Sequence, residues 1–512
     1  MYQDRHGSLV PGPDRVEQFR FAALASVRSK PKIDKTKLCR IVVQHMSPSD
    51  QRNPLMKPAI SLTRRDFLSR AASKSKFLSI SVVAFGLTIL GASWASSASN
   101  CDGTPTYQIL REDVIINADI WDEEPKMLAA GLGFTSIIGV PGLDVNNPQL
   151  SEFLVRQAGG AWNTVMCQTG VIPTLNAYTS AQTPFAVAVA YGCPVVFADG
   201  LPVEFSWPIR PSTLDATDFL VTLNTGEKVV PEVASIAPNF EFNERSVAVL
   251  FGHFGNRFSP TDQRAVYPVE VEVVRDETPL QLVGLHGRIV EAIGFKVRTS
   301  GTPYTDPDVP PEQRGGPRLI GAKLSRMSTL GEGAPFPFNG TEPNDGVALY
   351  GQDAQYRLRL YTSGGFSPDG VRGVFPTEFS RYFRLHAKSK GKKVLLTETG
   401  VDYTIQGGKV RIVGLADLGR PASVYDDCYT EDQDNYIDII LAGDEAAVRR
   451  ITHVEIPAVG DYQPFYNPGG PGNNPTPGVR YTAPCKPQLQ KVMMALDDPM
   501  TVTFIHTNRA AP

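Results

Sequence analysis

The stretch from residue 218 to residue 236 reads DFLVTLNTGEKVVPEVASI and indicates a β fold. Two apolar runs rich in Val and Leu flank the turn residues Asn224, Thr225, Gly226 and Glu227. A short segment with Asn and Gly between two such runs is typical of a β-hairpin, since Gly accepts the positive φ angles that tight turns need. The sequence therefore predicts two antiparallel strands joined at residues 224–227.

Further runs of the same kind surround this hairpin. Residues 245–255 (RSVAVLFGHFG), 267–274 (YPVEVEVV) and 287–297 (GRIVEAIGFKV) each have the length and residue alternation expected of a strand. Turn-separated strands at this spacing are typical of an immunoglobulin-like sandwich. We therefore predict one β-sandwich domain over residues 206–300.

A second β region follows a Pro- and Gly-rich connector at residues 300–317. Between residues 318 and 506, several short segments alternate polar and apolar residues, among them QYRLRLYTS, VDYTIQGGKVRIVGL and NYIDIILAG. Gly407 and Gly408 are expected to turn one hairpin. These patterns predict a second sandwich over residues 318–506. The expected fold class is thus mainly β, with two immunoglobulin-like or sandwich-like domains.

Residues 99–205 are predicted to form a mixed α/β N-terminal segment ahead of these domains. The runs EEPKMLAAGLG (123–133) and NPQLSEFLVRQAGGAW (147–162) have the apolar spacing of short helices, and the second begins at Asn147 and Pro148. The run PFAVAVAYGCPVVFADG (184–200) is typical of buried strands.

Charge is distributed unevenly along the 512 residues, of which 42% are apolar and 20% charged. Residues 1–98 contain 16 Lys and Arg against 6 Asp and Glu, and the remaining residues contain 34 against 47. Because binding to phosphate groups needs clustered Lys and Arg, the acidic remainder argues against a nucleic-acid partner.

The basic N-terminal region contains the motif TRRDFL at residues 63–68. A 15-residue apolar run follows at residues 77–91, and small residues then lead to Ser96-Ser97-Ala98, a suitable cleavage site. A positive end, an apolar middle too short for a comfortable membrane span and a small-residue exit are the features of a secretory signal peptide. The motif resembles the twin-arginine signal, with Ser69 in place of the Lys that often follows it.

This resemblance covers residues 56–98 and concerns the signal peptide alone. It implies that the twin-arginine export machinery moves the folded chain to the periplasm or the exterior of a bacterial cell, with no transmembrane anchor after cleavage. We expect translation to start at Met56 or Met46, so that residues 1–55, or residues 1–45, are not translated. The alternative is a plastid transit peptide, although residues 1–55 contain five acidic residues and only five Ser.

Six cysteines are present, and Cys39 lies in the leader. The others are Cys101, Cys167, Cys193, Cys428 and Cys485. An exported protein can keep disulfides. Spacing favours pairs between Cys167 and Cys193 and between Cys428 and Cys485, and buried free thiols are the alternative.

An acidic run at residues 426–438 is a candidate calcium site. Its six acidic residues are Asp426, Asp427, Glu431, Asp432, Asp434 and Asp438. Calcium binds six to eight oxygen atoms, which such a run can supply. The alternative is an acidic loop that faces water without a metal.

His453 and Glu455 form a second candidate metal site. Residues two apart on a strand point to the same face, so a His-x-Glu sequence can hold a metal ion. The alternative is an ordinary surface histidine beside a carboxylate.

Two function classes follow from these features. The first is an exported binding or structural protein of the cell envelope or the extracellular space, stabilised by calcium; its small-molecule or glycan ligand is unknown. The second is a metal-dependent enzyme, a hydrolase or an oxidoreductase, exported in folded form. Standard motifs of hydrolases and nucleotide-binding proteins are missing from residues 99–512. Two further predictions are anion binding by Arg372 in the Gly-rich loop 360–373 and glycan binding by exposed Trp207 or Tyr466.

Overall fold

The computed structural model describes residues 109–132, 147–157, 162–164, 177–179, 199–256, 261–299, 317–334, 346–368, 372–419, 421–422, 424–426, 429, 435–463, 465, 487–498 and 502–504. The predicted signal peptide and all six cysteines lie outside these residues, so the signal peptide and the disulfides stay predictions.

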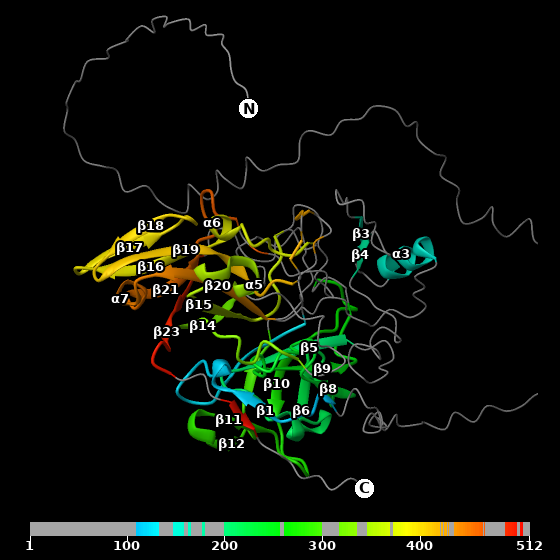
Figure 1. The fold of residues 1–512 in the computed structure, drawn as a ribbon. Coiled ribbons are helices and arrows are strands. Elements are labelled where there is room, and N and C mark those ends of the chain that lie inside the picture. The colour runs from blue at the N-terminus through cyan, green and yellow to red at the C-terminus, as the bar shows by residue number, and fades with distance from the viewer. Residues whose placement is uncertain are drawn as a thin grey trace, which may run out of the picture.

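Two four-stranded antiparallel sheets make up a first β body, and Figure 1 labels its strands β5, β6, β8, β9 and β10. The first sheet has the order β2 (Met127–Ala130), β5 (Asp199–Phe205), β9 (Val247–Gly252) and β8 (Val233–Ser235). The second sheet has the order β13 (Lys296–Arg298), β10 (Pro268–Val273), β6 (Phe219–Leu223) and β7 (Lys228–Val229).

The core of the first body draws buried side chains from both sheets. Phe205 of β5, Leu250 of β9 and Phe219 of β6 belong to the same hydrophobic cluster. Alternation along β6 places Phe219, Val221 and Leu223 in this core, while the residues between them are half-buried. Fully burying such a side chain contributes about 1.5–3 kcal/mol, so this cluster is a main source of stability for the first body.

The hairpin predicted from residues 218–236 is confirmed in its first half. Strands β6 and β7 pair antiparallel around residues 224–227, and Gly226 has a φ of 87°. Beyond Pro231, however, β8 pairs with β9 in the other sheet. Proline cannot donate a backbone hydrogen bond, which ends the pairing with β6 and lets the chain cross between the sheets.

A second β body contains a six-stranded and a four-stranded sheet. The six-stranded sheet has the order β18 (Asp402–Ile405), β19 (Gly408–Ala416), β20 (Tyr436–Gly443), β15 (Tyr356–Thr362), β14 (Leu319–Arg326) and β23 (Met493–Met494). The four-stranded sheet has the order β17 (Lys392–Leu396), β16 (Arg384–Ser389), β21 (Ile451–Ile456) and β22 (Gln488–Lys491). All of these strands pair antiparallel except β14 and β23, which are parallel.

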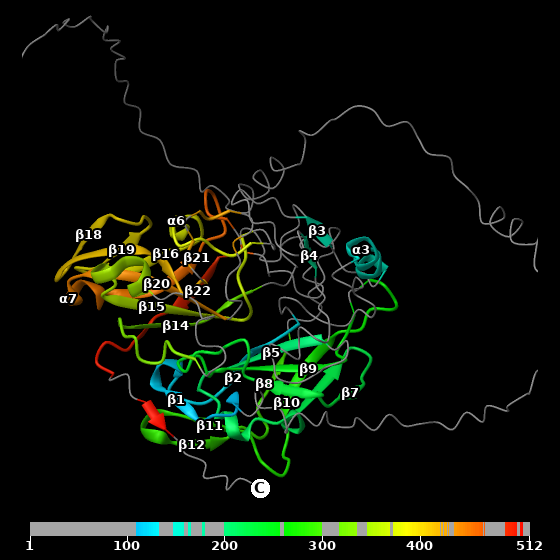
Figure 2. The ribbon, with the colours of Figure 1, turned by 45° about the vertical axis from the view of Figure 1, so that its right-hand side comes forward.

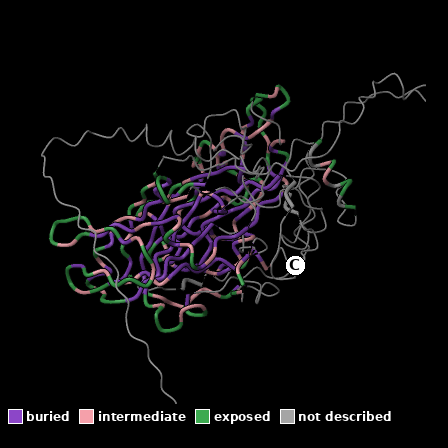
Figure 3. The backbone as a smooth tube through the Cα atoms, turned by 90° about the horizontal axis from the view of Figure 1, so that it is seen from above, coloured by how far each residue is buried: buried purple, intermediate pink, exposed green. Residues whose placement is uncertain are grey.

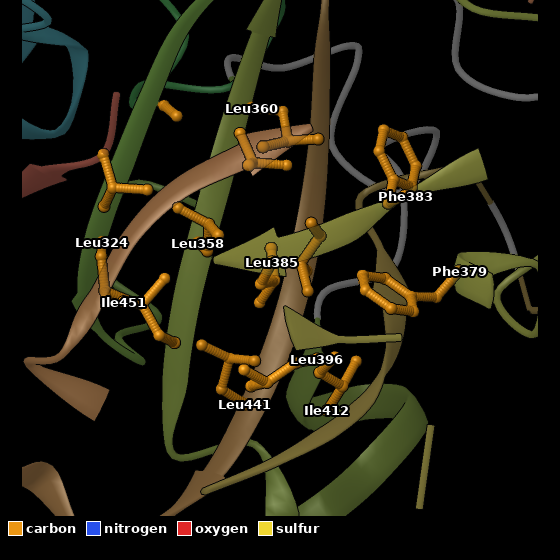
Figure 4. Packing of buried hydrophobic residues seen from close by; sticks show 14 of the residues in the cluster. Leu324, Leu358, Leu360, Phe379, Phe383, Leu385, Leu396, Ile412, Leu441 and Ile451 are labelled. Carbon is orange, nitrogen blue, oxygen red and sulfur yellow. The ribbon is translucent and has the colours of Figure 1, made fainter. Parts of the chain in front are cut away.

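The core of the second body again combines side chains from both of its sheets. Leu358 and Leu441 from the six-stranded sheet share a cluster with Leu385 and Ile451 from the four-stranded sheet. Figure 4 shows these side chains converging between the strands, with Phe379 and Phe383 at one end. Each body therefore has its own hydrophobic core between two sheets, an arrangement consistent with a β-sandwich.

The remaining elements are short. Three two-stranded sheets are formed by β1 (Val114–Ile116) with β24 (Val502–Phe504), β11 (Gln281–Val283) with β12 (Ile289–Glu291), and β3 (Trp162–Thr164) with β4 (Ala177–Thr179). The α-helices are α3 (Pro148–Gln157), α5 (Gly346–Tyr350), α6 (Phe379–Tyr382) and α7 (Glu445–Val448). The 3₁₀ helices are η1 (Asn117–Asp119), η2 (Pro211–Thr213), η3 (Ala216–Asp218), η4 (Leu285–Gly287) and η6 (Gly351–Asp353). Among the described residues, no helix is long and apolar enough to cross a membrane.

The predicted mainly β fold class is confirmed, with differences in the N-terminal segment. The helix predicted from Asn147 is α3, and the amide of Leu150 donates to Asn147 Oδ1 at 3.2 Å. The helix predicted at residues 123–133 is wrong, because residues 127–130 form β2 and pair with β5. Sheet pairing here outweighs the helical spacing of the apolar residues. Since β5 also pairs with β9, the first body takes strands from both sides of the predicted boundary between residues 205 and 206.

Candidate functional site

Strand β15 carries a polar face that is buried. Arg357, Arg359 and Tyr361 alternate with Leu358 and Leu360, which belong to the second core. All seven residues of β15 are nevertheless buried, so both faces of the strand are covered. Figure 3 shows buried backbone continuing through the centre of the described part of the chain. An alternating strand predicts one solvated face, but here the first body covers that face.

Contacts between the two bodies are polar and aromatic. The hydroxyl of Tyr361 donates to the carbonyl of Ser246 at 3.0 Å, and Asn435 Nδ2 donates to Glu204 Oε1 at 3.1 Å. The ring of Trp121 stacks on that of Tyr361 with their centroids 4.8 Å apart. Lys323 on β14 donates from Nζ to the carbonyl of Asn117 at 2.6 Å. In Figure 2 the sheet with β14 and β15 accordingly lies beside the first body.

Charged residues concentrate at this contact and form what we call the inter-body cluster. Its members are Glu241, Glu244, Glu332, Arg357, Arg359, Asp417 and Asp438. Glu241 and Glu244 come from the first body, Glu332 from the segment after β14, and the others from the six-stranded sheet or its end.

Arg359 is the centre of the inter-body cluster. Its guanidinium donates from Nε to Asp438 Oδ1 at 2.9 Å and from Nη2 to Asp417 Oδ2 at 2.6 Å. Nη1 lies 3.4 Å from Glu244 Oε1, a carboxylate of the first body. Burial alone would lower the pKa of Arg359, but the carboxylates of Asp417 and Asp438 raise it well above its usual range. Arg359 therefore stays charged and ties the two bodies together.

Arg357 lies two residues before Arg359 on the same face of β15 and joins the same cluster. It forms a short ion pair with Glu332 Oε1, and its Nη1 lies 3.5 Å from Asp438 Oδ2. Glu332 Oε1 also accepts from Asn243 Nδ2 at 3.0 Å. Asp438 is thus shared between the two arginines.

Three carboxylates converge beside these arginines, and we call them the carboxylate triad: Glu241, Glu332 and Asp417. One oxygen from each can be chosen so that all lie within 4.8 Å of one another. Glu241 Oε2, Glu332 Oε2 and Asp417 Oδ1 are buried and have no hydrogen-bond partner within the described part of the chain. Burial raises the pKa of Glu241 and that of Asp417 well above the usual range, and neighbouring carboxylates add to the shift. The triad is therefore unfavourable as three free anions.

Asp119 and Arg245 border the inter-body cluster on the side of the first body. The amide of Arg245 donates to Asp119 Oδ2 at 2.6 Å, and the Arg245 guanidinium donates to the carbonyl of Phe240 at 3.1 Å. This second contact fixes the backbone next to Glu241. Burial raises the pKa of Asp119 to about 6 and lowers that of Arg245 to about 10.

The predicted calcium run is only partly described. Asp427, Glu431, Asp432 and Asp434 lie outside the described residues. Asp426 is buried, and the amide of Tyr429 donates to its carbonyl at 2.9 Å. Asp438 lies on β20, and its carboxylate forms ion pairs with Arg357 and Arg359. Both of its oxygens therefore already contact cations. A calcium site at residues 426–438 stays a prediction.

His453 and Glu455 both lie on β21, and His386 on β16 contacts both of them. The rings of His386 and His453 are 6.1 Å apart, and His386 Nε2 forms a short contact with Glu455 Oε2. Arg384 donates to both Glu455 oxygens, at 2.7 and 2.9 Å. Although burial acts in the opposite direction, this arginine lowers the pKa of Glu455. Arg384 thus occupies the carboxylate that the predicted metal site requires, and the metal prediction itself remains untested.

Two other sequence predictions need correction. Trp207 is 2% exposed, belongs to the first core and donates from Nε1 to the carbonyl of Asp122 at 2.9 Å, so it is not an exposed glycan-binding aromatic. Tyr466 lies outside the described residues.

Arg372 forms a two-bonded ion pair with Glu378, at 2.8 and 2.9 Å, and its guanidinium lies over the Phe375 ring. These contacts make Arg372 a structural residue of its loop rather than an anion ligand.

Sequence patterns gave little indication of the inter-body cluster. Its acidic residues are distributed over the segment 239–246, the segment after β14 and the ends of two strands, so no spacing rule connects them. The two arginines at alternate positions in QYRLRLYTS follow the ordinary pattern of a strand with one solvated face, so they gave no signal of their burial.

Comparison with family models, with curated proteins and with solved structures finds no match to this chain.

Proposed function

We propose that the chain is an exported binding or structural protein, built from two immunoglobulin-like sandwich domains that the inter-body cluster holds in a fixed arrangement. It acts in the periplasm or outside a bacterial cell and reaches that location by the twin-arginine route that the TRRDFL motif implies.

The observation that carries this proposal is the burial of the inter-body cluster. Arg357 and Arg359 are 1% and 3% exposed, and their partners come from both bodies. A catalytic site needs access for its substrate, whereas a buried ion-pair network fixes the relative position of the parts that it joins. The burial of the inter-body cluster thus supports a structural role, in which its ion pairs hold the two bodies together.

Calorimetry on the chain from residue 99 onward tests the rigid arrangement. Because both bodies share the network, we expect a single unfolding transition whose calorimetric and van't Hoff enthalpies agree. Two separate transitions, each belonging to one body, would contradict the proposal. In that case the bodies would be independent domains on a connector.

The alternative is a metal-dependent enzyme, which the contact of His386 with both His453 and Glu455 keeps as a candidate. Metal analysis of protein that folded in the cytoplasm separates the two candidates. An enzyme of this kind is expected to contain a stoichiometric transition metal. The proposed structural protein is expected to contain calcium or no metal.

A further inference from the structure

We propose that the carboxylate triad of Glu241, Glu332 and Asp417 binds one calcium ion between the two bodies. This inference deepens the proposed function, because the ion would hold together the same contact that the inter-body cluster forms. The predicted run at residues 426–438 contains none of these three residues.

Distances within the carboxylate triad fit a single ion. Calcium lies about 2.3–2.6 Å from its oxygen ligands, so two oxygens on one ion are at most about 5 Å apart. The ligand oxygens of Glu241, Glu332 and Asp417 all lie within 4.8 Å of one another. This spacing is compatible with one cation between the three carboxylates.

Each carboxylate of the triad has an oxygen that could accept a cation, because it has no hydrogen-bond partner within the described residues. Arg357 occupies Glu332 Oε1, and Arg359 occupies Asp417 Oδ2. The second oxygen of each carboxylate, together with Glu241 Oε2, has no hydrogen-bond partner within the described residues. Glu241 is only 2% exposed and Asp417 only 1%. Leaving such buried acceptors unpaired is unfavourable, and a bound cation removes that cost.

Charge balance points in the same direction. Five carboxylates in the inter-body cluster face two guanidinium groups. Glu244, Glu332 and Asp417 all act on Glu241 as repelling charges. A divalent cation at the carboxylate triad would reduce the excess negative charge from three to one. Two protons could achieve a similar balance, so protonated carboxyl groups are the alternative that the experiment must separate.

Ligand chemistry favours calcium over other divalent ions. The triad offers carboxylate oxygens, which suit hard cations, whereas zinc and copper prefer nitrogen and sulfur. Magnesium requires near-ideal octahedral geometry, which suits three carboxylates from separate segments less well. Calcium tolerates irregular geometry and accepts carboxylates from distant parts of a chain.

Calorimetric titration of the full chain with calcium chloride, after removal of metals by a chelator, tests the proposal. We expect one equivalent of calcium to bind and to raise the Tm. Glu241→Gln keeps the side-chain shape but removes a ligand charge, so it should weaken calcium affinity roughly tenfold or more and abolish the increase in Tm. Glu227→Gln is the matched control, since Glu227 is exposed in the β6–β7 turn, and it should bind as the original chain does. Magnesium chloride and manganese chloride, titrated separately, should bind more weakly than calcium.

Each other outcome overturns the inference. If no calcium binds and Glu241→Gln raises the Tm of the metal-free protein, the triad holds protons. If calcium binds equally to Glu241→Gln but not to a variant with Asp432→Asn and Asp434→Asn, the ion belongs to the acidic run at residues 426–438. A single unfolding transition of the chelated protein would still support the rigid arrangement, so failure of the calcium site and failure of the proposed function are distinguishable.

Discussion

Glu204 illustrates how the contact between the bodies changes the chemistry of a single carboxyl group. It is fully buried, Asn435 donates to one of its oxygens, and the other oxygen has no partner within the described residues. Burial raises the pKa of Glu204 to about 8, from a reference value of 4.5. The folded protein therefore keeps a proton on Glu204 at pH values where the unfolded chain has released it.

We predict that Glu204→Gln changes the pH dependence of stability. The folded-state pKa is the higher one, so the contribution of neutral Glu204 is complete below about pH 4.5 and is lost as pH rises toward 8. Glutamine cannot lose a proton, so the variant should gain free energy of unfolding relative to the original chain by up to about 1.4 kcal/mol per pH unit in this window. Urea denaturation at about pH 5 and about pH 8 measures this difference. A difference that does not vary with pH would mean that Glu204 is ionised when folded.

Arg359 allows a second test at the scale of single residues. Arg359→Met should lower the free energy of unfolding by about 3–5 kcal/mol, because Asp417 and Asp438 would lose a buried partner. Arg275→Met is the matched control, since Arg275 is exposed and its Nη2 lies 3.5 Å from Glu291 Oε2. Exposed pairs of that kind contribute about 0–1 kcal/mol. Equal losses of unfolding free energy in the two variants would show that the inter-body cluster stabilises the protein no more than an exposed ion pair does.

Strands and turns were largely predictable because their signals are local. Phe219, Val221 and Leu223 face the first core as their alternation requires. The β18–β19 hairpin also exists, although Ile405 pairs with Gly408 and the turn is formed by Gln406 and Gly407. What covers the second face of a strand is a non-local property. The burial of Arg357 and Arg359, and hence the carboxylate triad, could not be derived from periodicity alone.

Glycines in two hairpins provide a prediction at the scale of elements. Gly226 has a φ of 87° and open space where a Cβ would lie, so Gly226→Ala should cost about 1–2 kcal/mol through backbone strain alone. Gly408 has a φ of 144°, and a Cβ there would overlap the Asp444 carboxylate. That carboxylate accepts from the amide of Lys409 at 2.8 Å. Gly408→Ala should therefore cost more than Gly226→Ala in denaturant titrations, and the reverse order would contradict the turn geometry.

At the scale of the whole molecule, one strand pairing joins two segments that lie far apart in the sequence. Strand β1, the first strand in the described residues, pairs antiparallel with β24, and Val114 lies opposite Phe504. Residues between them include the whole second body, so this pairing cannot form until the second body and residues 502–504 have been synthesised. Such late pairing is compatible with the export after folding that the resemblance of residues 56–98 to a twin-arginine signal implies.

Export provides the corresponding prediction. Changing Arg64→Lys and Arg65→Lys together keeps the positive charge but removes the arginine pair that defines the signal. In bacteria expressing the full chain, we expect the original protein in the periplasm or medium, shortened to begin near residue 99, and the double variant uncleaved in the cytoplasm. Fractionation with N-terminal sequencing measures both. Ser69→Lys, which restores the residue that often follows the motif, should not reduce export. If the double variant is exported as well as the original chain, the basic region acts only through its charge, and the folded protein need not form before it crosses the membrane.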